Sequence, residues 1–138
     1  MGVRILTEIK HDNNLIATSA FVNSGYEAYK PEIHIPLKLA KRLGFKLEEL
    51  KGEKYKVVGT EITAYELGKV SVKVSVSNKA ISWVEANAVT APGEYEVIIS
   101  DALAEQLGIE IVKPKTGLWR FHGESINRES IEPQYWIE

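Results

Sequence analysis

The feature that most constrains the fold of this chain is the alternation of apolar and polar residues. Residues 70–76 read Val-Ser-Val-Lys-Val-Ser-Val, a strict period of two. That period puts the valines on one face of an extended strand and the polar residues on the other. Similar short apolar runs, separated by polar turns, lie at 3–9, 15–22, 81–84 and 86–89. The pattern predicts a mainly β chain that opens with a hairpin, whose turn lies at 11–14.

Only two segments have a helical pattern, Leu37–Leu43 after Pro36 and Asp101–Leu107 after Ser100, and a glycine closes each of them. The two helices align at an offset of 64 residues, with identical pairs Ile35/Ile99, Leu39/Leu103, Ala40/Ala104, Leu43/Leu107 and Gly44/Gly108. The match indicates either a diverged internal duplication or convergence of two short amphipathic helices. With so many strands, the chain is expected to form a small, largely antiparallel β barrel or sandwich with two short helices.

Composition excludes several functional classes. A chain of 138 residues with 44% apolar residues predicts one domain, residues 1–138, with a substantial core. Seventeen Lys and Arg against nineteen Asp and Glu leave no basic excess for nucleic acid. No apolar run approaches the roughly 20 residues of a membrane helix, and no signal-peptide core opens the chain. With no cysteine, disulfides and thiolate chemistry are excluded, and the cytosol is the expected compartment.

The segment with a chemical signature begins where the second strand ends, with Asn23, Ser24 and Gly25. It continues through Ile35-Pro36-Leu37-Lys38-Leu39-Ala40-Lys41-Arg42-Leu43-Gly44, and a later apolar pair, Ile98-Ile99-Ser100, leads into the second helix. This order resembles the retropepsin-like aspartic peptidases, whose signature is apolar-apolar-Asp-Thr/Ser-Gly followed by such a segment and, later, Leu-Ile-Gly before a helix. The resemblance covers residues 15–111, and it implies a retropepsin-like acid-protease barrel.

The resemblance also implies a reaction. In that family two aspartates share a proton and activate a water molecule, because two like charges about 3 Å apart cannot both ionise. One triplet per chain then implies a homodimer that acts on a peptide or protein substrate without a cofactor or metal. The small residue and the glycine, here Ser24 and Gly25, shape the paired loops.

The sequence departs from the family at its most important position, because Asn23 stands where the aspartate belongs. An amide has nearly the same shape as a carboxylate but cannot act as the base, so no peptidase activity is expected of the chain as written. Three explanations stay open: an Asp-to-Asn inactivation of an enzyme, a natural pseudoenzyme that binds peptides or forms a dimeric scaffold, and a coincidental turn. A further hypothesis is that Asn23 deamidates to aspartate after folding.

A hairpin that covers the substrate, the flap of this family, is expected at 57–68, with Gly59 and Gly68 as turn points. Its candidate substrate-binding residues are Gly59, Thr60, Glu61 and Tyr65. An ordinary β-hairpin is the alternative interpretation.

Several other residues favour structural interpretations. Ser100 replaces the usual glycine of the family and is expected to cap the second helix. Glu27 and Glu32 are expected to be surface carboxylates. The histidines lack the spacing of a metal site, and Ser24 lacks the Gly-x-Ser-x-Gly context of a hydrolase nucleophile. The terminal segments 3–9 and 133–138 either interleave with a second subunit or pack on their own barrel.

Overall fold

The computed structural model describes residues 2–49, 52–57 and 60–137, and of residues 49, 52–57 and 60–63 it describes the backbone alone. The elements, in chain order, are β1 Arg4–His11, β2 Asn14–Val22, β3 Glu32–His34, α1 Leu37–Arg42, the 3₁₀ turn η1 Leu47–Glu49, β4 Gly52–Val57, β5 Thr60–Val74, β6 Val84–Thr90, β7 Val97–Ile99, α2 Asp101–Gln106, β8 Ile109–Lys113 and β9 Leu118–Phe121. The expectation of a mainly β fold with two short helices is confirmed.

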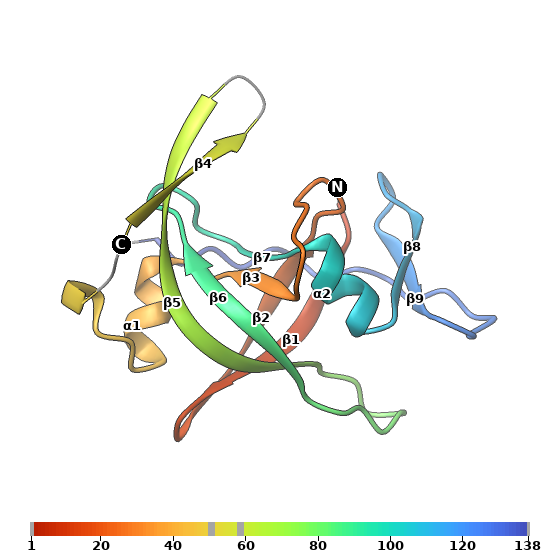
Figure 1. Ribbon diagram of the computed structural model, residues 1–138. Coiled ribbons are helices and arrows are strands. Elements are labelled where there is room, and N and C mark those ends of the chain that lie inside the picture. The colour runs from red at the N-terminus through yellow and green to blue at the C-terminus, as the bar shows by residue number, and fades with distance from the viewer. Residues whose placement is uncertain (1, 50–51, 58–59, 138) are drawn as a thin grey trace.

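Six strands close into a barrel in the order β1-β2-β7-β3-β6-β5, because β1 pairs with β2 on one side and with β5 on the other (Figure 1). Strand β4 extends the sheet beyond β5, and β8 and β9 form a separate hairpin. The alternation in β5 is realised as predicted, since Val70, Val72 and Val74 are buried in the core. Residues 81–83, expected to be extended, lie outside the strands, and β6 begins at Val84.

The two halves of the chain interlock through their short strands. Strand β3 pairs antiparallel with β7, with Ile33 opposite Ile99. Strand β2 of the first half lies parallel to β7 of the second, and β6 of the second half lies parallel to β3 of the first. These two parallel pairings are absent from the sequence expectation of a largely antiparallel barrel. Because the two parallel pairings are reciprocal, the two similar segments of the sequence take equivalent positions in the fold.

The two helices also end in the same way. Each helix ends at the residue directly before a leucine C-cap. The residue after that leucine, Gly44 or Gly108, has a left-handed φ of 88° or 75°. Both glycines therefore occupy the position that the sequence predicts. Their surroundings differ, because a Cβ on Gly44 would lie 2.9 Å from the side-chain nitrogen of Asn14, whereas at Gly108 no described atom lies within 4 Å of such a Cβ.

Strand β5 is 15 residues long and curves from the projecting hairpin with β4 into the barrel wall (Figure 1). Its register against β6 shifts between Glu66 and Gly68, and Gly68 has a φ of 127°. Gly68 is thus a bulge that bends one continuous strand, and its expected role as a turn point is wrong.

The C-terminal segment packs against its own barrel. The backbone nitrogen of Ile131 donates to the carbonyl of Arg4, and that of Trp136 donates to the carbonyl of Tyr95. The indole of Trp136 is buried and donates to the hydroxyl of Thr18 at 3.0 Å. Arg4 in turn forms two hydrogen bonds with the carboxylate of Glu96, at 2.7 and 3.1 Å. Because β1 has partners on both edges and Trp136 is covered, both terminal segments are held within one chain.

The two equivalent glycines permit a matched test. Gly108→Ala adds a methyl group in open space and is expected to cost about 1–2 kcal/mol, the penalty of a left-handed alanine. Gly44→Ala is expected to cost about 1 kcal/mol more, because the Asn14 amide must turn away and lose its hydrogen bond to the carbonyl of Leu43. The free energies of unfolding in urea measure both effects. Equal losses would show that the Asn14 contact contributes nothing.

Candidate functional site

The three residues of the candidate catalytic triplet lie together in a tight turn at the end of β2. The backbone nitrogen of Asn23 donates to the carbonyl of Ile99 in β7 at 3.1 Å, and its own carbonyl accepts from the nitrogen of Tyr26 at 3.0 Å. The side-chain Oδ1 of Asn23 accepts from the nitrogen of Gly25 at 3.0 Å. Asn23 is half-buried, while Ser24 and Gly25 are exposed. The asparagine side chain therefore shapes the turn that it begins.

The second half of the chain has an equivalent turn without an equivalent side chain. Val97 of β7 matches Ile33 of β3, and their parallel partners are Ala20 and Ala88. By the same register, the residues after β6 that correspond to 23–25 are 91–93, which read Ala-Pro-Gly. One chain therefore carries a single polar side chain of this kind, Asn23, and an apolar alanine takes the matching place.

The loop that follows the triplet is anchored to α2. The carboxylate of Asp101 accepts from the backbone nitrogen of Ala28 at 2.9 Å, and the nitrogen of Asp101 donates to the carbonyl of Tyr26 at 2.9 Å. The phenol of Tyr26 also donates to the carboxylate of Glu32. The sequence interpretation missed these roles of Asp101 and Tyr26, and it treated Glu32 as a surface group. The one available signal was an Asp directly after an N-cap serine, in the first turn of a helix.

Ser100 caps α2, as predicted, and also joins two elements. Its hydroxyl accepts from the nitrogen of Leu103 at 3.2 Å and from the nitrogen of Glu32, at the start of β3, at 3.1 Å. Its own nitrogen donates to the carbonyl of Glu32. The residue is fully buried. The serine side chain thus links α2 to β3.

Removing this hydroxyl should destabilise the fold. Ser100→Ala leaves a helix N-terminus uncapped and the nitrogen of Glu32 without its acceptor, so the free energy of unfolding is expected to fall by about 2 kcal/mol. Ser82→Ala, at an exposed serine, is the control and should change it by less than about 0.5 kcal/mol. Urea unfolding of both variants provides the comparison. An unchanged Ser100→Ala midpoint would contradict the capping role.

The predicted flap region forms part of a hairpin. Strands β4 and β5 pair from Gly52 opposite Tyr65 to Val57 opposite Thr60. Thr60 and Glu61 therefore flank the outer end, while Gly59 lies outside the described residues. Tyr65 is at the base, where β5 also pairs with Thr90 of β6.

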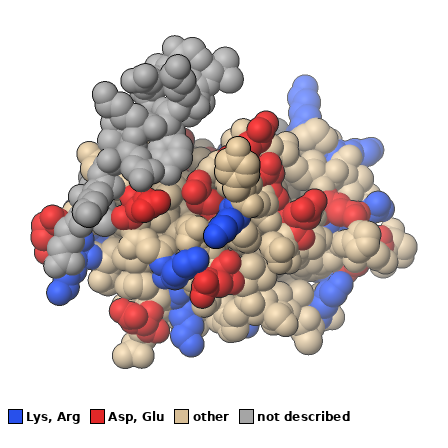
Figure 2. Space-filling model, in the orientation of Figure 1, with Lys and Arg blue, Asp and Glu red and all other residues tan. Residues whose placement is uncertain are grey.

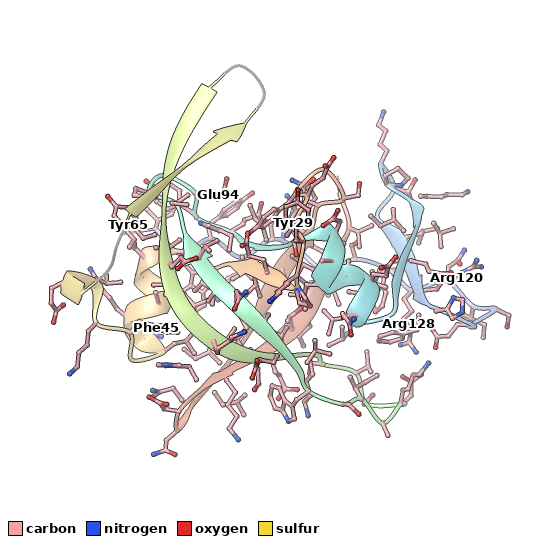
Figure 3. The ribbon with its side chains drawn as sticks, in the orientation of Figure 1. Tyr29, Phe45, Tyr65, Glu94, Arg120 and Arg128 are labelled. Carbon is pink, nitrogen blue, oxygen red and sulfur yellow. The ribbon has the colours of Figure 1, made fainter. Side chains whose placement is uncertain are left out.

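The hairpin rises on the side of the barrel where the loop after Asn23 also emerges (Figures 1 and 3). Figure 3 labels Tyr65 at the foot of the hairpin and Tyr29 in that loop. The structure brings Asn23, Ser24 and Gly25 together in one turn, and it places Thr60, Glu61 and Tyr65 in the β4–β5 hairpin.

The three histidines lie in separate surroundings. The imidazole of His11 donates to the carbonyl of Leu43 and stacks on Phe45, with ring centroids 3.8 Å apart. His122 is exposed and bonds to Glu110. Across 2–49, 52–57 and 60–137, no three His, Cys, Asp or Glu side chains gather as metal ligands would.

His34 is the buried histidine. Its Nδ1 donates to the carbonyl of Glu96 at 2.8 Å, and its Nε2 has no hydrogen-bond partner among the described residues. Burial lowers the pKa of His34 from its ordinary value of 6.5, and this outweighs the bond to Glu96 and the negative charge of Glu94, which both raise it. The folded protein therefore holds this imidazole neutral at pH values where the unfolded chain binds a proton.

This difference makes the stability depend on pH. As the pH falls below about 6.5, the unfolded chain takes up a proton that the folded chain refuses, so the free energy of unfolding should fall; above that pH the contribution is fully present. His34→Gln should flatten the profile between pH 5 and 6.5. Urea unfolding across that range gives the slopes. A profile that keeps its slope in His34→Gln would assign the proton uptake elsewhere.

A cavity of about 280 Å³ lies at the other end of β2 from Asn23. It is lined by Lys10, His11, Asp12, Lys69, Val70, Ser71, Trp83 and Glu85. The ammonium of Lys69 lies 3.4 Å from the carboxylate of Glu85, so much of the charge there is compensated. On the face in Figure 2, acidic and basic side chains of the described residues are interspersed, without a continuous patch of one sign.

No model of a known family matches this chain, and no curated protein matches it either. Within the described part of the chain, none of the helices has the length and apolar character to cross a membrane. The chemistry of the Asn23 turn is therefore the basis on which a function is assigned.

Proposed function

We propose that this chain is a retropepsin-like domain that pairs with a second copy to form a peptide-binding cleft, and that it has no peptidase activity in this form. The observation that carries the proposal is the Asn23 turn. A small polar triplet leaves β2 beside the parallel strand β7, is tied to Ile99, and turns around its own side chain. This is the place where an aspartic peptidase of this kind would present its carboxylate.

The chemistry explains why activity is absent. In an active dimer, one carboxylate accepts the proton of the attacking water, and its protonated partner hydrogen-bonds the developing oxyanion. The amide of Asn23 can donate and accept hydrogen bonds, but it cannot take up a proton at the pH where such enzymes work. A carboxylate at the same position could accept the bond from the Gly25 nitrogen, since the two side chains are nearly isosteric.

A second copy is required because one chain supplies one such side chain. The equivalent turn of the other half has Ala91, so the internal duplication cannot complete the pair. The exposure of Ser24, Gly25 and Tyr29 supports the dimer, since these residues leave an accessible surface around Asn23. Two such turns would meet about a two-fold axis.

The β4–β5 hairpin is the element proposed to cover an extended peptide. Strand β4 pairs with β5 on one edge and lies at the end of the sheet order. Such an edge can bind a peptide backbone by strand addition. Thr60 and Glu61 lie near the outer end, and Tyr65 lies at the hinge between hairpin and barrel. The proposed reaction needs no cofactor, and the absence of cysteine favours a cytosolic location.

The alternative function is a natural non-catalytic module that binds peptides or serves as a dimeric scaffold. It is favoured by the way in which the Asn23 amide itself completes the turn through the Gly25 nitrogen. The domain therefore keeps its loop geometry without a carboxylate.

The two functions are separated by restoring the carboxylate. Asn23→Asp should cleave peptides from a mixed library between acidic and neutral pH, because it supplies the proton acceptor that the amide lacks. The chain as written and Asn87→Asp, which adds the same charge in β6, should show no cleavage. Mass spectrometry of the library measures cleavage, and analytical ultracentrifugation measures dimerisation.

A folded, dimeric Asn23→Asp protein without activity would refute the peptidase assignment and favour the binding module. A protein that stays monomeric at all accessible concentrations would refute both.

A further inference from the structure

The Asn23 side chain and the backbone that follows it are arranged for a reaction with each other. The nitrogen of Gly25 donates to Oδ1 of Asn23 at 3.0 Å, which draws electrons from the side-chain carbonyl carbon. The backbone nitrogen of Ser24, the residue directly after Asn23, forms no hydrogen bond to any of the described residues. Ser24 and Gly25 are exposed, so water reaches the turn.

These features suit intramolecular deamidation. The nitrogen of Ser24, after losing its proton to water or hydroxide, attacks Cγ of Asn23. The bond from Cγ to Nδ2 breaks, Nδ2 leaves as ammonia, and a five-membered succinimide remains. Water then opens the ring at one of its two carbonyl carbons, giving either aspartate or isoaspartate at position 23. No electron is gained or lost, and the co-reactant is water alone.

The other asparagines lack the combination found at Asn23, which is a small following residue whose backbone nitrogen has no hydrogen bond to the described residues. Asn13, Asn14 and Asn87 are followed by residues paired in strands β2 and β6. Asn127 is followed by Arg128, whose nitrogen donates to the carbonyl of Trp119 at 2.6 Å. Asn78 is followed by a lysine and accepts from the guanidinium of Arg128 at 3.3 Å. Asn23 precedes a small serine, Ser24, whose backbone nitrogen has no hydrogen bond to the described part of the chain.

We infer that Asn23 is a self-modification site at which the folded chain converts an amide into a carboxylate without another enzyme. The bonds from Asn23 to Ile99 and Tyr26 keep the ends of the turn in place during the reaction. The aspartate product has the side chain that the triplet lacks, whereas isoaspartate has an extra backbone carbon. That this product gains peptidase activity rests on the proposed function; the modification itself does not.

The test is to incubate the full chain at pH 8 and 37 °C, in buffer and in urea, and to follow intact mass and peptide maps over weeks. We expect the peptide containing residue 23 to gain the mass of deamidation first, at least severalfold faster than the peptide containing Asn127. We also expect conversion at Asn23 to be faster in the folded chain than in urea. An unchanged Asn23, or faster conversion in urea, would overturn the inference, because the turn would then protect the amide.

Two variants provide controls. Ser24→Val places a β-branched residue at the attacking nitrogen and should slow conversion severalfold, while Asn23→Gln, whose longer side chain must close a larger ring, should not convert in the same period. Circular dichroism checks that both variants fold. Conversion at an equal rate in Ser24→Val would overturn the role assigned to the Ser24 nitrogen.

The aspartate and isoaspartate forms are then separated by ion exchange and assayed beside Asn23→Asp. If the aspartate form and Asn23→Asp both cleave peptides, the inference and the proposed function both stand. If residue 23 converts but neither protein cleaves, the proposed function fails and the modification stands. If residue 23 does not convert while Asn23→Asp cleaves, the inference fails alone.

Discussion

The antiparallel pairing of β3 with β7 is the contact on which the rest of this structure depends. It joins the two halves of the chain at Ile33 and Ile99, both fully buried, and it places each half's longer strand beside the other half's short one. The ladders of β2 and β6 are completed only across this junction. Both helices and both turns that follow the longer strands take their positions from it.

The pairing of β3 with β7 also determines what holds the Asn23 turn in place. The parallel neighbour β7 supplies the carbonyl of Ile99 that holds Asn23, and α2, which follows β7, supplies the Asp101 carboxylate that holds the loop beyond. Asn23, at the end of β2, and the loop after it are thus held by elements of the opposite half. Under the proposed function, the difference between a peptidase and a binding module is one atom of one side chain, because amide and carboxylate share a shape but differ in their capacity to hold a proton.

Local patterns predicted the elements well, because they depend on neighbouring residues. The alternation at 70–74, the N-cap at Ser100 and the glycines after both helices are present in the structure as expected, although β5 ends at Val74 rather than Val76. The bulge at Gly68 was read as a turn, since a glycine in a strand signals either, and only the pairing of β5 with both β4 and β6 distinguishes them. The anchoring of the triplet loop by Asp101 was missed because the two lie more than 70 residues apart in the chain.

The sequence by itself determined the mainly β character, the two short helices with their caps, and the identity of the triplet Asn23-Ser24-Gly25, because these follow from residue type and short-range spacing. The closure of the barrel, the parallel pairings and the packing of Trp136, in the C-terminal segment, against Thr18 of β2 were decided by the tertiary structure. They depend on which distant strands come together to bury their apolar faces, and a one-dimensional pattern does not specify that choice. The same long-range packing leaves the Ser24 nitrogen without a hydrogen bond to the described residues, whereas the nitrogen of Arg128, after Asn127, donates to the carbonyl of Trp119.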